Sequence, residues 1–429
     1  MKILVISGEV WRDDTNGGNV LSNIFKGFDA EFSQIYCNPG EPQNNLCKHY
    51  YQMTEGQAMR AFLKRKPIGQ EIEYDTFPTG EEKEQTSAEQ KGKKTSFFQK
   101  HKLGIFYFAR DFLWNTAKWK NDKLKRFLDN ANPDIIFAPC YGSPFMLKLT
   151  RFVAKYTGKK VISYISDDAY TLKQFRLSPY FWIRRFWVRR QMRKTFPLYS
   201  LCYTMTERQK LQCEKDFNAN MKILRKTADL LEIPDKSAVN TPVKFVYAGG
   251  IYLNRWKTLG KIAKAIKEVN KDGVKATLDV YTANELTKKM SKLLDDKINS
   301  TVHGSVSLDK LNEIYKNSDV AIHAESFDLR NRLAVRMSFS TKIIDCLASG
   351  CACLAVCDSK QGGYEYLTAE DCAICVDDLN NLPNKISELV NNPDKIIEYA
   401  NKAKDCIRRN HLRDDVSKML REDFNKYSE

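Results

Sequence analysis

The sequence predicts an α/β protein made of two parallel-sheet domains. Its 429 residues exceed what one ordinary hydrophobic core accommodates. In both halves, short apolar runs alternate with segments of helical periodicity, which is typical of successive strand–helix units. A polar, proline-marked stretch at 233–242 separates the halves. We therefore expect domains over 1–232 and 240–400, facing each other across a cleft that binds the ligand.

The first half begins with a buried strand at Lys2–Ser7, followed by a loop that contains Gly17 and Gly18. A helical pattern starts at Val20, so this loop opens a helix and can approach a phosphate. It has no GxGxxG fingerprint, which argues against a dinucleotide site. Later in this half we expect strands at 135–138, 161–165, 198–205 and 221–224, and helices at 103–128 and 144–156.

Two further stretches of the first half stand out. Residues 78–102 are polar and repetitive and cannot bury surface, so we expect a mobile surface insertion there. Asp167 and Asp168 directly follow the strand at 161–165. Carboxylates at this end of a parallel strand lie where open α/β sheets bind ligands, which makes Asp168 a catalytic candidate. Alternatively, one of the two carboxylates caps the next helix.

The net charge of +16 requires an anionic partner, whether nucleic acid, anionic lipid or a sugar phosphate. The segment 173–196 contains eight Lys and Arg, no acidic residue, and aromatic side chains between the cations. This mixture suits the headgroup region of an anionic membrane. The alternatives are nucleic acid, for which the sequence has no motif, and a solvated face over a buried groove. The predicted membrane contacts are Trp182, Arg185, Phe186, Arg189, Arg190 and Arg193.

Cysteine usage and the N-terminus indicate the compartment. The twelve cysteines lie mostly in apolar runs, which favours buried thiols in a reducing cytosol over a metal or redox pair at Cys372 and Cys375. Too few apolar residues follow Lys2 for a secretory signal, and no run approaches 18 apolar residues. We expect a cytoplasmic protein that lies peripherally on the inner face of the cell membrane.

The second half alternates more regularly. We expect strands at 245–248, 276–281, 301–302, 320–323, 353–356 and 373–376, and helices at 259–269, 286–294, 308–317, 341–348, 382–390 and 394–408. After the first of these strands, Gly249 and Gly250 are followed by Arg255 and Lys257. Glycines that let the backbone approach a ligand, then cations and a helix N-terminus, present a phosphate site. Many strand–helix turns with these residues bind no ligand, which leaves that alternative open.

A second candidate group follows the strand at 320–323. Glu325 lies in the loop after it, and further along Thr341, Lys342 and Asp345 share one face of a predicted helix. A hydroxyl and a cation at a helix N-terminus can hold an anionic group, and a carboxylate one turn later can accept two hydroxyl protons, as a ribose offers. Alternatively, Lys342 and Asp345 form a surface ion pair on an ordinary helix.

Together, the stretches AGGIYLNRWKTL, HGSVSLDKLNEIYKNSDVAIHAESF and STKIIDCLASGCACLAV resemble the retaining GT-B glycosyltransferases of family 4. The resemblance is strong over 244–367 and weak over 29–130. It implies the GT-B fold, an α/β architecture of two Rossmann-like domains: an acceptor-binding domain at 1–232 and a nucleotide-sugar donor domain at 240–400. It also implies that a final helix, within 401–429, packs back on the first domain.

By this resemblance, Gly249 and Arg255 hold the donor diphosphate, and Gly17 and Gly18 face it. Gly250 stands where the family usually has an arginine. That part of the clamp is therefore missing or supplied from elsewhere, for example by Lys257 or Lys342.

The family has two glutamates at this site, and this sequence matches their places unequally. Asp345 stands at the place of the glutamate that binds the donor ribose. The other glutamate usually lies about eight positions earlier, whereas Glu325 lies 20 positions before Asp345. We interpret the difference as a 12-residue insertion.

The implied activity is transfer of a sugar from a nucleoside diphosphate, UDP first among them, to a lipid-linked or polysaccharide acceptor at the membrane surface. Capsule or exopolysaccharide synthesis is such a process. Arg255, Glu325 and Asp168 would serve catalysis, and cations with helix N-termini would stabilise the leaving diphosphate without a metal or other cofactor. The alternatives are a nucleotide-sugar epimerase and a non-catalytic nucleotide-sugar-binding protein of the same fold.

Overall fold

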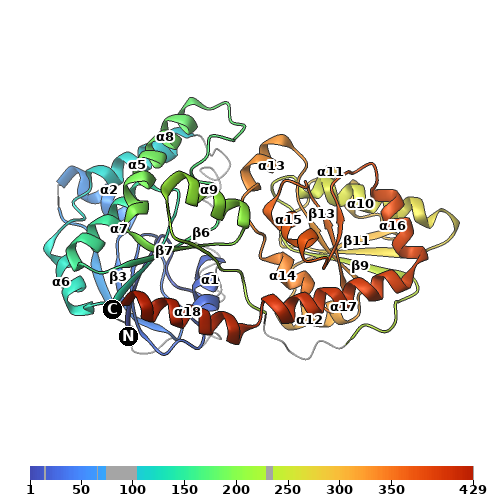
Figure 1. Cartoon of the computed structure of the whole chain (residues 1–429). Helices are drawn as coiled ribbons and strands as arrows, with labels where there is room; N and C mark the ends of the chain where they lie inside the picture. Colours follow the sequence, from blue (N-terminus) through green and yellow to red (C-terminus); the bar gives the residue numbers. More distant parts are fainter. Residues whose placement is uncertain (14–15, 65, 74–103, 229–234, 429) are drawn as a thin grey trace.

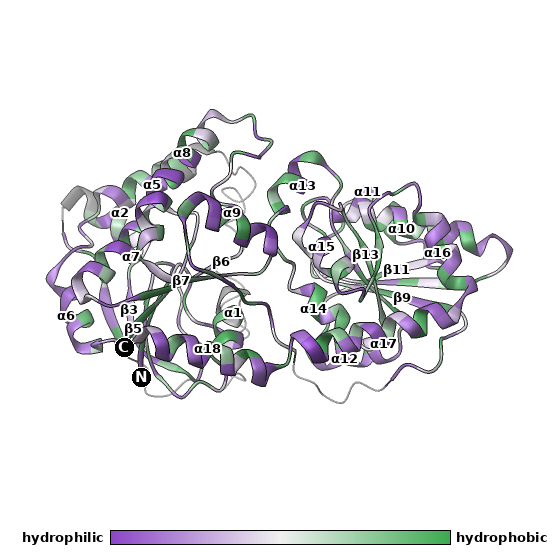
Figure 2. Ribbon diagram, in the orientation of Figure 1, coloured by the Kyte–Doolittle hydropathy of each residue, from purple (hydrophilic) through white to green (hydrophobic). Residues whose placement is uncertain are grey.

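The computed structural model describes residues 1–428 except 14–15, 65, 74–103 and 229–234. Two halves, each a sheet covered by helices, lie side by side (Figure 1). Apolar residues are concentrated in the strands of both sheets, and hydrophilic residues are frequent on the helices around them (Figure 2). The insertion expected at 78–102 lies outside the described residues.

The first sheet has eight strands in the order β4-β3-β2-β1-β5-β6-β7-β8, parallel except for the antiparallel edge pair β3 and β4. Its strands are β1 (Lys2–Ser7), β2 (Glu31–Tyr36), β3 (Cys47–Gln52), β4 (Gln70–Glu73), β5 (Ile135–Pro139), β6 (Val161–Ile165), β7 (Tyr199–Thr204) and β8 (Met221–Ile223). The helices of this half are α1 (Asn16–Phe25), α2 (Glu55–Lys64), α5 (Gly104–Thr116), α6 (Asp122–Ala131), α7 (Pro144–Thr157), α8 (Pro179–Thr195) and α9 (Glu207–Phe217).

The second sheet has six parallel strands in the order β11-β10-β9-β12-β13-β14. They are β9 (Val243–Ala248), β10 (Ala276–Tyr281), β11 (Ser300–His303), β12 (Val320–Ala324), β13 (Ala352–Val356) and β14 (Ile374–Val376). The helices are α10 (Arg255–Val269), α11 (Lys288–Leu294), α12 (Leu308–Lys316), α13 (Leu329–Val335), α14 (Lys342–Leu347), α15 (Gly362–Ala369), α16 (Leu382–Asn391) and α17 (Pro393–Asn410). This is the strand order of the Rossmann fold, whose ligands bind at the carboxyl ends of the strands where the order reverses.

The last two helices join the halves. Helix α17 lies against β13 of the second half, and α18 (Arg413–Ser428) lies against β5 and β6 of the first (Figure 1). Phe424 of α18 is buried, with its ring centroid 5.7 Å from that of Phe25 and 6.1 Å from that of Phe137. The hydroxyl of Tyr203 donates to Asp423 over 2.7 Å. The chain therefore crosses back after residue 410 rather than at 401.

Several local expectations need correction. The glycines at 17–18 belong to the first turn of α1, which begins at Asn16 rather than near Val20. The helix expected at 103–128 is two helices, because Asn121 ends a turn and caps α6 by accepting from two of its backbone N–H groups. Helix α10 begins at Arg255, not at Leu259. No helix among the described residues is long and apolar enough to cross a bilayer.

Candidate active site

A cavity of about 420 Å³ lies between the two halves at the carboxyl ends of their strands. The first half contributes residues that follow β5 and β6, and the second half contributes residues that follow β9 and β12. Polar lining residues include Tyr141, Ser166 and Asp167 on the first side and Arg255, His323, Glu325, Thr341 and Gln361 on the second. The topology therefore places this cavity where a doubly wound sheet binds its ligand.

A buried ion pair forms one wall of the cavity. Arg255 donates from Nε to Glu325 Oε2 over 2.8 Å and from Nη2 to Oε1 over 2.6 Å. The two residues are 8% and 4% exposed. Burial opposes the charge of Arg255, but the hydrogen bonds and charge of Glu325 outweigh it and raise the pKa of the guanidinium. The bidentate geometry fixes a permanent cation at the edge of the cavity.

The glycine turn after β9 is shaped around a lysine. Gly249 has φ +139°, and a Cβ there would lie 2.1 Å from both Cε and Nζ of Lys342. The absent side chain thus lets the amine of Lys342 lie on the turn, where it donates to the Tyr247 hydroxyl over 2.9 Å. Burial, and next the charge of Arg255, lower the pKa of Lys342 to about 8. A second cation therefore lies beside Arg255.

The neighbouring glycine lies against the ring of Tyr252. A Cβ at Gly250 would lie 2.3 Å from Cε1 of Tyr252, whose ring lies under the Arg255 guanidinium at 4.9 Å. A larger residue at 250 would therefore displace this exposed ring. Of the two cations expected as replacements, Lys342 lies on the Gly249 turn, whereas Lys257 bonds to Asp328 over 3.1 Å; neither is among the lining residues of the cavity.

Two buried polar atoms that line the cavity lack partners. His323 Nδ1 and Gln361 Nε2 make no hydrogen bond, although these residues are only 2% and 4% exposed. Burial lowers the pKa of His323 to about 4, and the charges of Lys342 and Arg255 act in the same direction, so the ring is neutral. Because buried polar groups are almost always paired, these two atoms indicate a site for a polar ligand.

The two candidate carboxylates of the second half lie apart. Glu325 lines the cavity, but Asp345 does not; its carboxylate is half exposed and accepts a hydrogen bond from Lys226, where the chain leaves the first half. Thr341 lines the cavity as expected. The expected cluster on one helix face is thus divided: Thr341 lines the cavity, Lys342 lies against the Gly249 turn, and Asp345 lies at the junction of the halves.

Asp168 does not reach the cavity, although its neighbour Asp167 does. Asp168 is 9% exposed and accepts from the backbone N–H of Thr171 over 2.8 Å. Two guanidinium groups, of Arg185 and Arg336, each bond to it over 3.2 Å. The carboxylate is fully engaged, so this geometry gives Asp168 a structural role in place of the expected catalytic one.

Comparison with known proteins agrees with this architecture. Residues 262–421 match a family described as glycosyl transferase-like. The structure is similar to HepE from Anabaena in complex with UDP, at 11% identity and a TM-score of 0.59, covering 99% of this chain and 100% of that one. The family match covers part of the second half and the C-terminal helices, and the structural similarity shows a shared fold.

Two more solved structures show the same fold. Sucrose-phosphate synthase from Thermosynechococcus elongatus matches at 11% identity and a TM-score of 0.62, with 99% of each chain covered. A UDP-forming α,α-trehalose-phosphate synthase from Burkholderia xenovorans, in complex with glucose-6-phosphate, matches at 7% identity and a TM-score of 0.56, with 100% of each chain covered. The predicted GT-B architecture is thereby confirmed. A search of curated proteins found no match.

Within this glycosyltransferase fold, the residues between Glu325 and Asp345 form helix α13 and its flanking loops. This segment, 326–340, contacts the first half across the cleft. The backbone oxygen of Leu333 accepts from Gln174 over 3.3 Å, and Ser338 donates to Asp167 over 2.9 Å. The segment that separates the two carboxylates therefore forms a bridge between the halves.

The expected membrane contacts on α8 are only partly exposed. Arg185 is buried against Asp168, Arg189 donates to the Tyr170 backbone oxygen over 2.5 Å, and Arg193 donates to the Tyr170 hydroxyl over 2.8 Å. Trp182 donates to the Arg176 backbone oxygen and is half-buried. Phe186 and Arg190 are exposed. Three of the arginines therefore bond to the loop that α8 packs against and hold this helix on its own domain.

His323, Gln361 and Gly363 line the cavity but were not predicted as site residues. His323 lies inside a strand of apolar type, and Gln361 has no distinguishing context. Gly362 and Gly363 open α15 after β13, which is the same strand–glycine–helix pattern that drew attention to Gly249. That repeated pattern was a usable signal for this part of the cavity.

Proposed function

We propose that the protein is a retaining glycosyltransferase that takes its sugar from a nucleoside diphosphate, with UDP as the carrier. The observation that carries the proposal is that Arg255, His323 and Gln361 line one cavity, where the last two each have a buried polar atom without a partner, while Lys342 lies against the adjoining Gly249 turn. The similar HepE structure contains UDP, which supports the choice of nucleotide.

The residues suit the chemistry of sugar transfer. The bond from the anomeric carbon to the diphosphate breaks, the diphosphate takes the electron pair, and an acceptor hydroxyl bonds to the same carbon. The acceptor's proton is released to the leaving oxygen or to solvent. Arg255 and Lys342 would stabilise the charge that builds on the diphosphate, and neutral His323 can hydrogen-bond a sugar hydroxyl. No metal is needed in this proposal.

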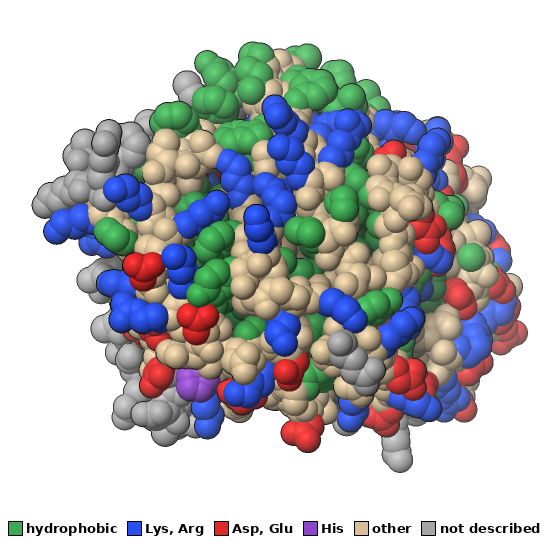
Figure 3. Space-filling model, turned by 60° about the vertical axis from the view of Figure 1, so that its left-hand side comes forward, with side chains coloured by type: hydrophobic (Ala, Val, Ile, Leu, Met, Phe, Trp, Pro, Cys, Tyr) green, Lys and Arg blue, Asp and Glu red, His purple; other side chains and the backbone are tan. Residues whose placement is uncertain are grey.

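A membrane-bound acceptor is supported by an exposed apolar surface, which we call the apolar cap. It is formed by the loop before α8 and the first turns of that helix. Leu177 is 89% exposed and Phe186 is 56% exposed. Single exposed apolar residues are normal on a protein surface, but a group of them in one place marks an interaction site. Apolar side chains gather at one end of the molecule with Lys and Arg side chains beside them (Figure 3). The members of the apolar cap are Leu172, Phe175, Leu177, Tyr180, Ile183 and Phe186.

We further propose that the apolar cap enters the headgroup layer and brings the cleft to a lipid-linked acceptor or to a growing polysaccharide. The protein would then lie peripherally on the cytoplasmic face of the membrane. In this arrangement, the arginines of α8 that bond within the domain hold the helix in place, and exposed residues make the contact. An epimerase acting on a soluble nucleotide sugar would have no use for such a surface.

The test measures UDP release from UDP-sugars with and without membrane extract, together with flotation of the protein on phosphatidylglycerol vesicles. We expect release that depends on the extract, and flotation that is lost in a Leu177→Ser/Phe186→Ser variant. Leu308→Ser, at a leucine that is 72% exposed outside the apolar cap, is the matched control. UDP binding without turnover on any extract would favour a non-catalytic binding protein, and sugar isomerisation without transfer would favour an epimerase.

A further inference from the structure

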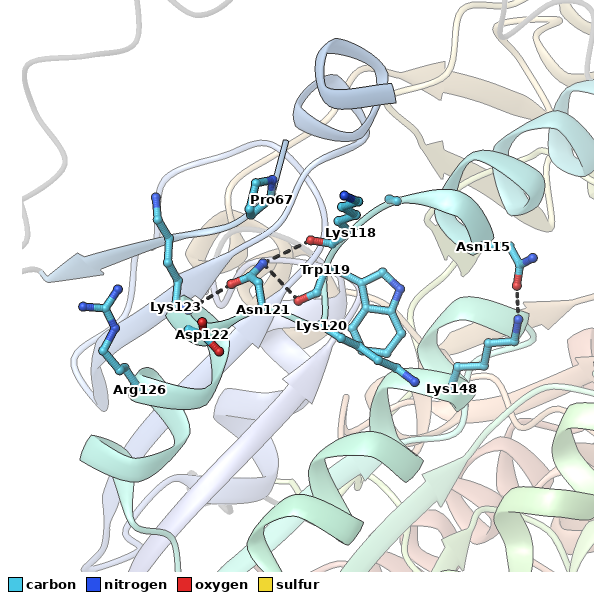
Figure 4. Close-up of a pocket in the computed structure, with 11 residues that line it drawn as sticks. Pro67, Asn115, Lys118, Trp119, Lys120, Asn121, Asp122, Lys123, Arg126 and Lys148 are labelled. Atoms are coloured by element: carbon cyan, nitrogen blue, oxygen red, sulfur yellow. Dashed lines mark hydrogen bonds between the residues drawn. The ribbon is translucent and has the colours of Figure 1, made fainter. Parts of the chain in front are cut away.

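A second cavity, of about 730 Å³, lies on the outside of the first half and away from the cleft. The turn between α5 and α6 forms one side, and α7 contributes Lys148. Figure 4 shows this turn, with Lys123 and Arg126 projecting from the start of α6. The cavity shares no residue with the candidate active site.

The lining of this cavity is strongly cationic. Lys118, Lys120, Lys123, Arg126 and Lys148 contribute five positive charges, and Asp122 is the acidic lining residue. Asp122 forms an ion pair with Lys125, with an N–O distance of 3.2 Å. Within the described ranges of the chain, none of the five cations pairs with a carboxylate, and Lys148 bonds instead to the amide oxygen of Asn115.

The cations are mounted on a rigid turn. The side-chain amide of Asn121 donates to the backbone oxygens of Ile68, Lys118 and Trp119 over 2.8–3.2 Å. Its oxygen accepts from the backbone N–H of Lys123 and Leu124. Trp119 is 4% exposed and lies between the ring of Phe145 and the amine of Lys120. A preformed turn loses little entropy when a ligand binds.

The like charges are close enough to act on one another. The pKa of Lys148 is lowered by its partial burial and next by the charges of Arg151, Lys120 and Lys194. An anion bound among these groups would relieve their repulsion. Lys148 also lies 5.6 Å from the ring centroid of Trp187 on α8, so this cavity and the apolar cap lie on connected elements of one domain.

We propose that this cavity is a phosphate-binding site, filled either by the headgroup phosphate of an anionic phospholipid or by a soluble phosphate. The carrying observation is a preformed hollow lined by five cations of which none has a carboxylate partner in the described chain. The proposal does not depend on the transfer reaction, so its failure would leave the nucleotide site in the cleft untouched.

The test reverses two charges, in a Lys123→Glu/Arg126→Glu variant. Both residues are exposed on α6, so folding is expected to survive. Lys418→Glu/Arg421→Glu is the matched control, because it replaces the same residue types at the same spacing on the exposed face of α18. Each protein is measured for binding to phosphatidylcholine vesicles with and without phosphatidylglycerol, and for its thermal midpoint with and without inorganic phosphate. UDP binding reports on the cleft.

We expect the Lys123→Glu/Arg126→Glu variant to bind the anionic vesicles at least roughly tenfold more weakly, or to lose its stabilisation by phosphate. The control variant should change little in both measurements. The first result identifies a lipid headgroup and the second a soluble phosphate. Equal losses in this variant and the control would indicate non-specific attraction and overturn the proposal. If the Lys123→Glu/Arg126→Glu variant kept both its binding to anionic vesicles and its stabilisation by phosphate, the proposal would also be wrong. A Lys118→Gln/Lys120→Gln variant repeats the test without introducing negative charge.

Discussion

Asp168 and Glu325 each form a buried cluster with arginine, and the two clusters differ in what they leave unsatisfied. Asp168 accepts from two arginines, from backbone N–H groups and from the Thr171 hydroxyl, so its oxygens have no capacity left for a ligand. Among the residues that the structure describes, Glu325 has Arg255 as its charged partner and lies near a histidine whose Nδ1 has no hydrogen bond. The first cluster joins the halves of the molecule, and the second faces a cavity.

The contrast teaches how to separate structural from functional charge in this fold. A carboxylate saturated by fixed donors is stable and inert, whereas a pair that adjoins unpartnered polar atoms can still bind. Position at the end of a strand does not distinguish them, because each carboxylate follows a strand at the carboxyl edge of its own sheet.

Replacing Arg255 with Gln is expected to lower the turnover number by roughly 100-fold or more, because a preorganised cation beside the leaving diphosphate is lost. Arg255→Lys keeps the charge and is expected to retain part of the rate. Steady-state kinetics with UDP-sugar measure both. A turnover number within a few-fold of wild type in Arg255→Gln would place the chemistry elsewhere.

Asp168→Asn is expected to act on stability instead. It leaves Arg185 and Arg336 buried without their carboxylate, and breaking a buried pair costs roughly 3–5 kcal/mol. The midpoint of urea denaturation should fall clearly, while the turnover number at low temperature stays within a few-fold of wild type. A large loss of turnover with unchanged stability would return Asp168 to the list of catalytic residues.

The lowered pKa of Lys342 predicts a pH dependence. The free amine titrates at about pH 8, and a bound diphosphate favours its protonated form. Affinity for UDP should therefore be constant below about pH 7 and fall by up to about tenfold per unit above pH 8. In the absence of ligand, the unfolded chain binds more protons between pH 8 and its ordinary lysine pKa, so stability rises with pH across that window.

Calorimetric titration with UDP across this pH range is the measurement. Lys342→Met should bind UDP more weakly and lose the fall above pH 8. If the wild-type affinity does not change through pH 8, Lys342 does not contact the diphosphate.

The smallest effect is expected at the pair of Lys226 and Asp345. Its side chains are 30% and 43% exposed, so removing the charge with Lys226→Ala should cost less than about 1 kcal/mol of stability. The same change frees the Asp345 carboxylate. If Asp345 binds the donor ribose, UDP affinity should rise slightly or stay constant in Lys226→Ala and fall in Asp345→Asn; unchanged affinity in Asp345→Asn would remove Asp345 from the site.

The strands of the second half could be predicted because most of them contain short apolar runs between helical segments. The region of β2, β3 and β4 was missed, since its buried positions include polar groups that hydrogen-bond inside the fold. Gln34 is fully buried and donates to Ser7 Oγ over 2.6 Å, and the Tyr50 hydroxyl donates to the Cys47 backbone oxygen over the same distance. Such hydrogen bonds offset the free-energy cost of burying polar groups. Because the groups are polar, these strands do not show a continuous apolar run in the sequence.

In the candidate site, too, local sequence features could be predicted and long-range contacts could not. Gly249 and Arg255 were identified because a glycine turn and a following cation are local features, and Glu325 because it directly follows a strand. The saturation of Asp168 could not be foreseen, since one of its arginines lies 168 positions along the chain. The position of Lys342 over Gly249 is equally non-local.

The central claim is that the cleft binds a nucleoside diphosphate through Arg255. The most direct test is a thermal-unfolding series with UDP, GDP, ADP, dTDP and CMP on wild type, Arg255→Gln and Asp168→Asn. One diphosphate, expected to be UDP, should add roughly 2.7 kcal/mol of stability at about 100 times its dissociation constant. That gain should disappear in Arg255→Gln and persist in Asp168→Asn. No stabilisation of wild type by any of the five, or equal stabilisation of Arg255→Gln, would contradict the account.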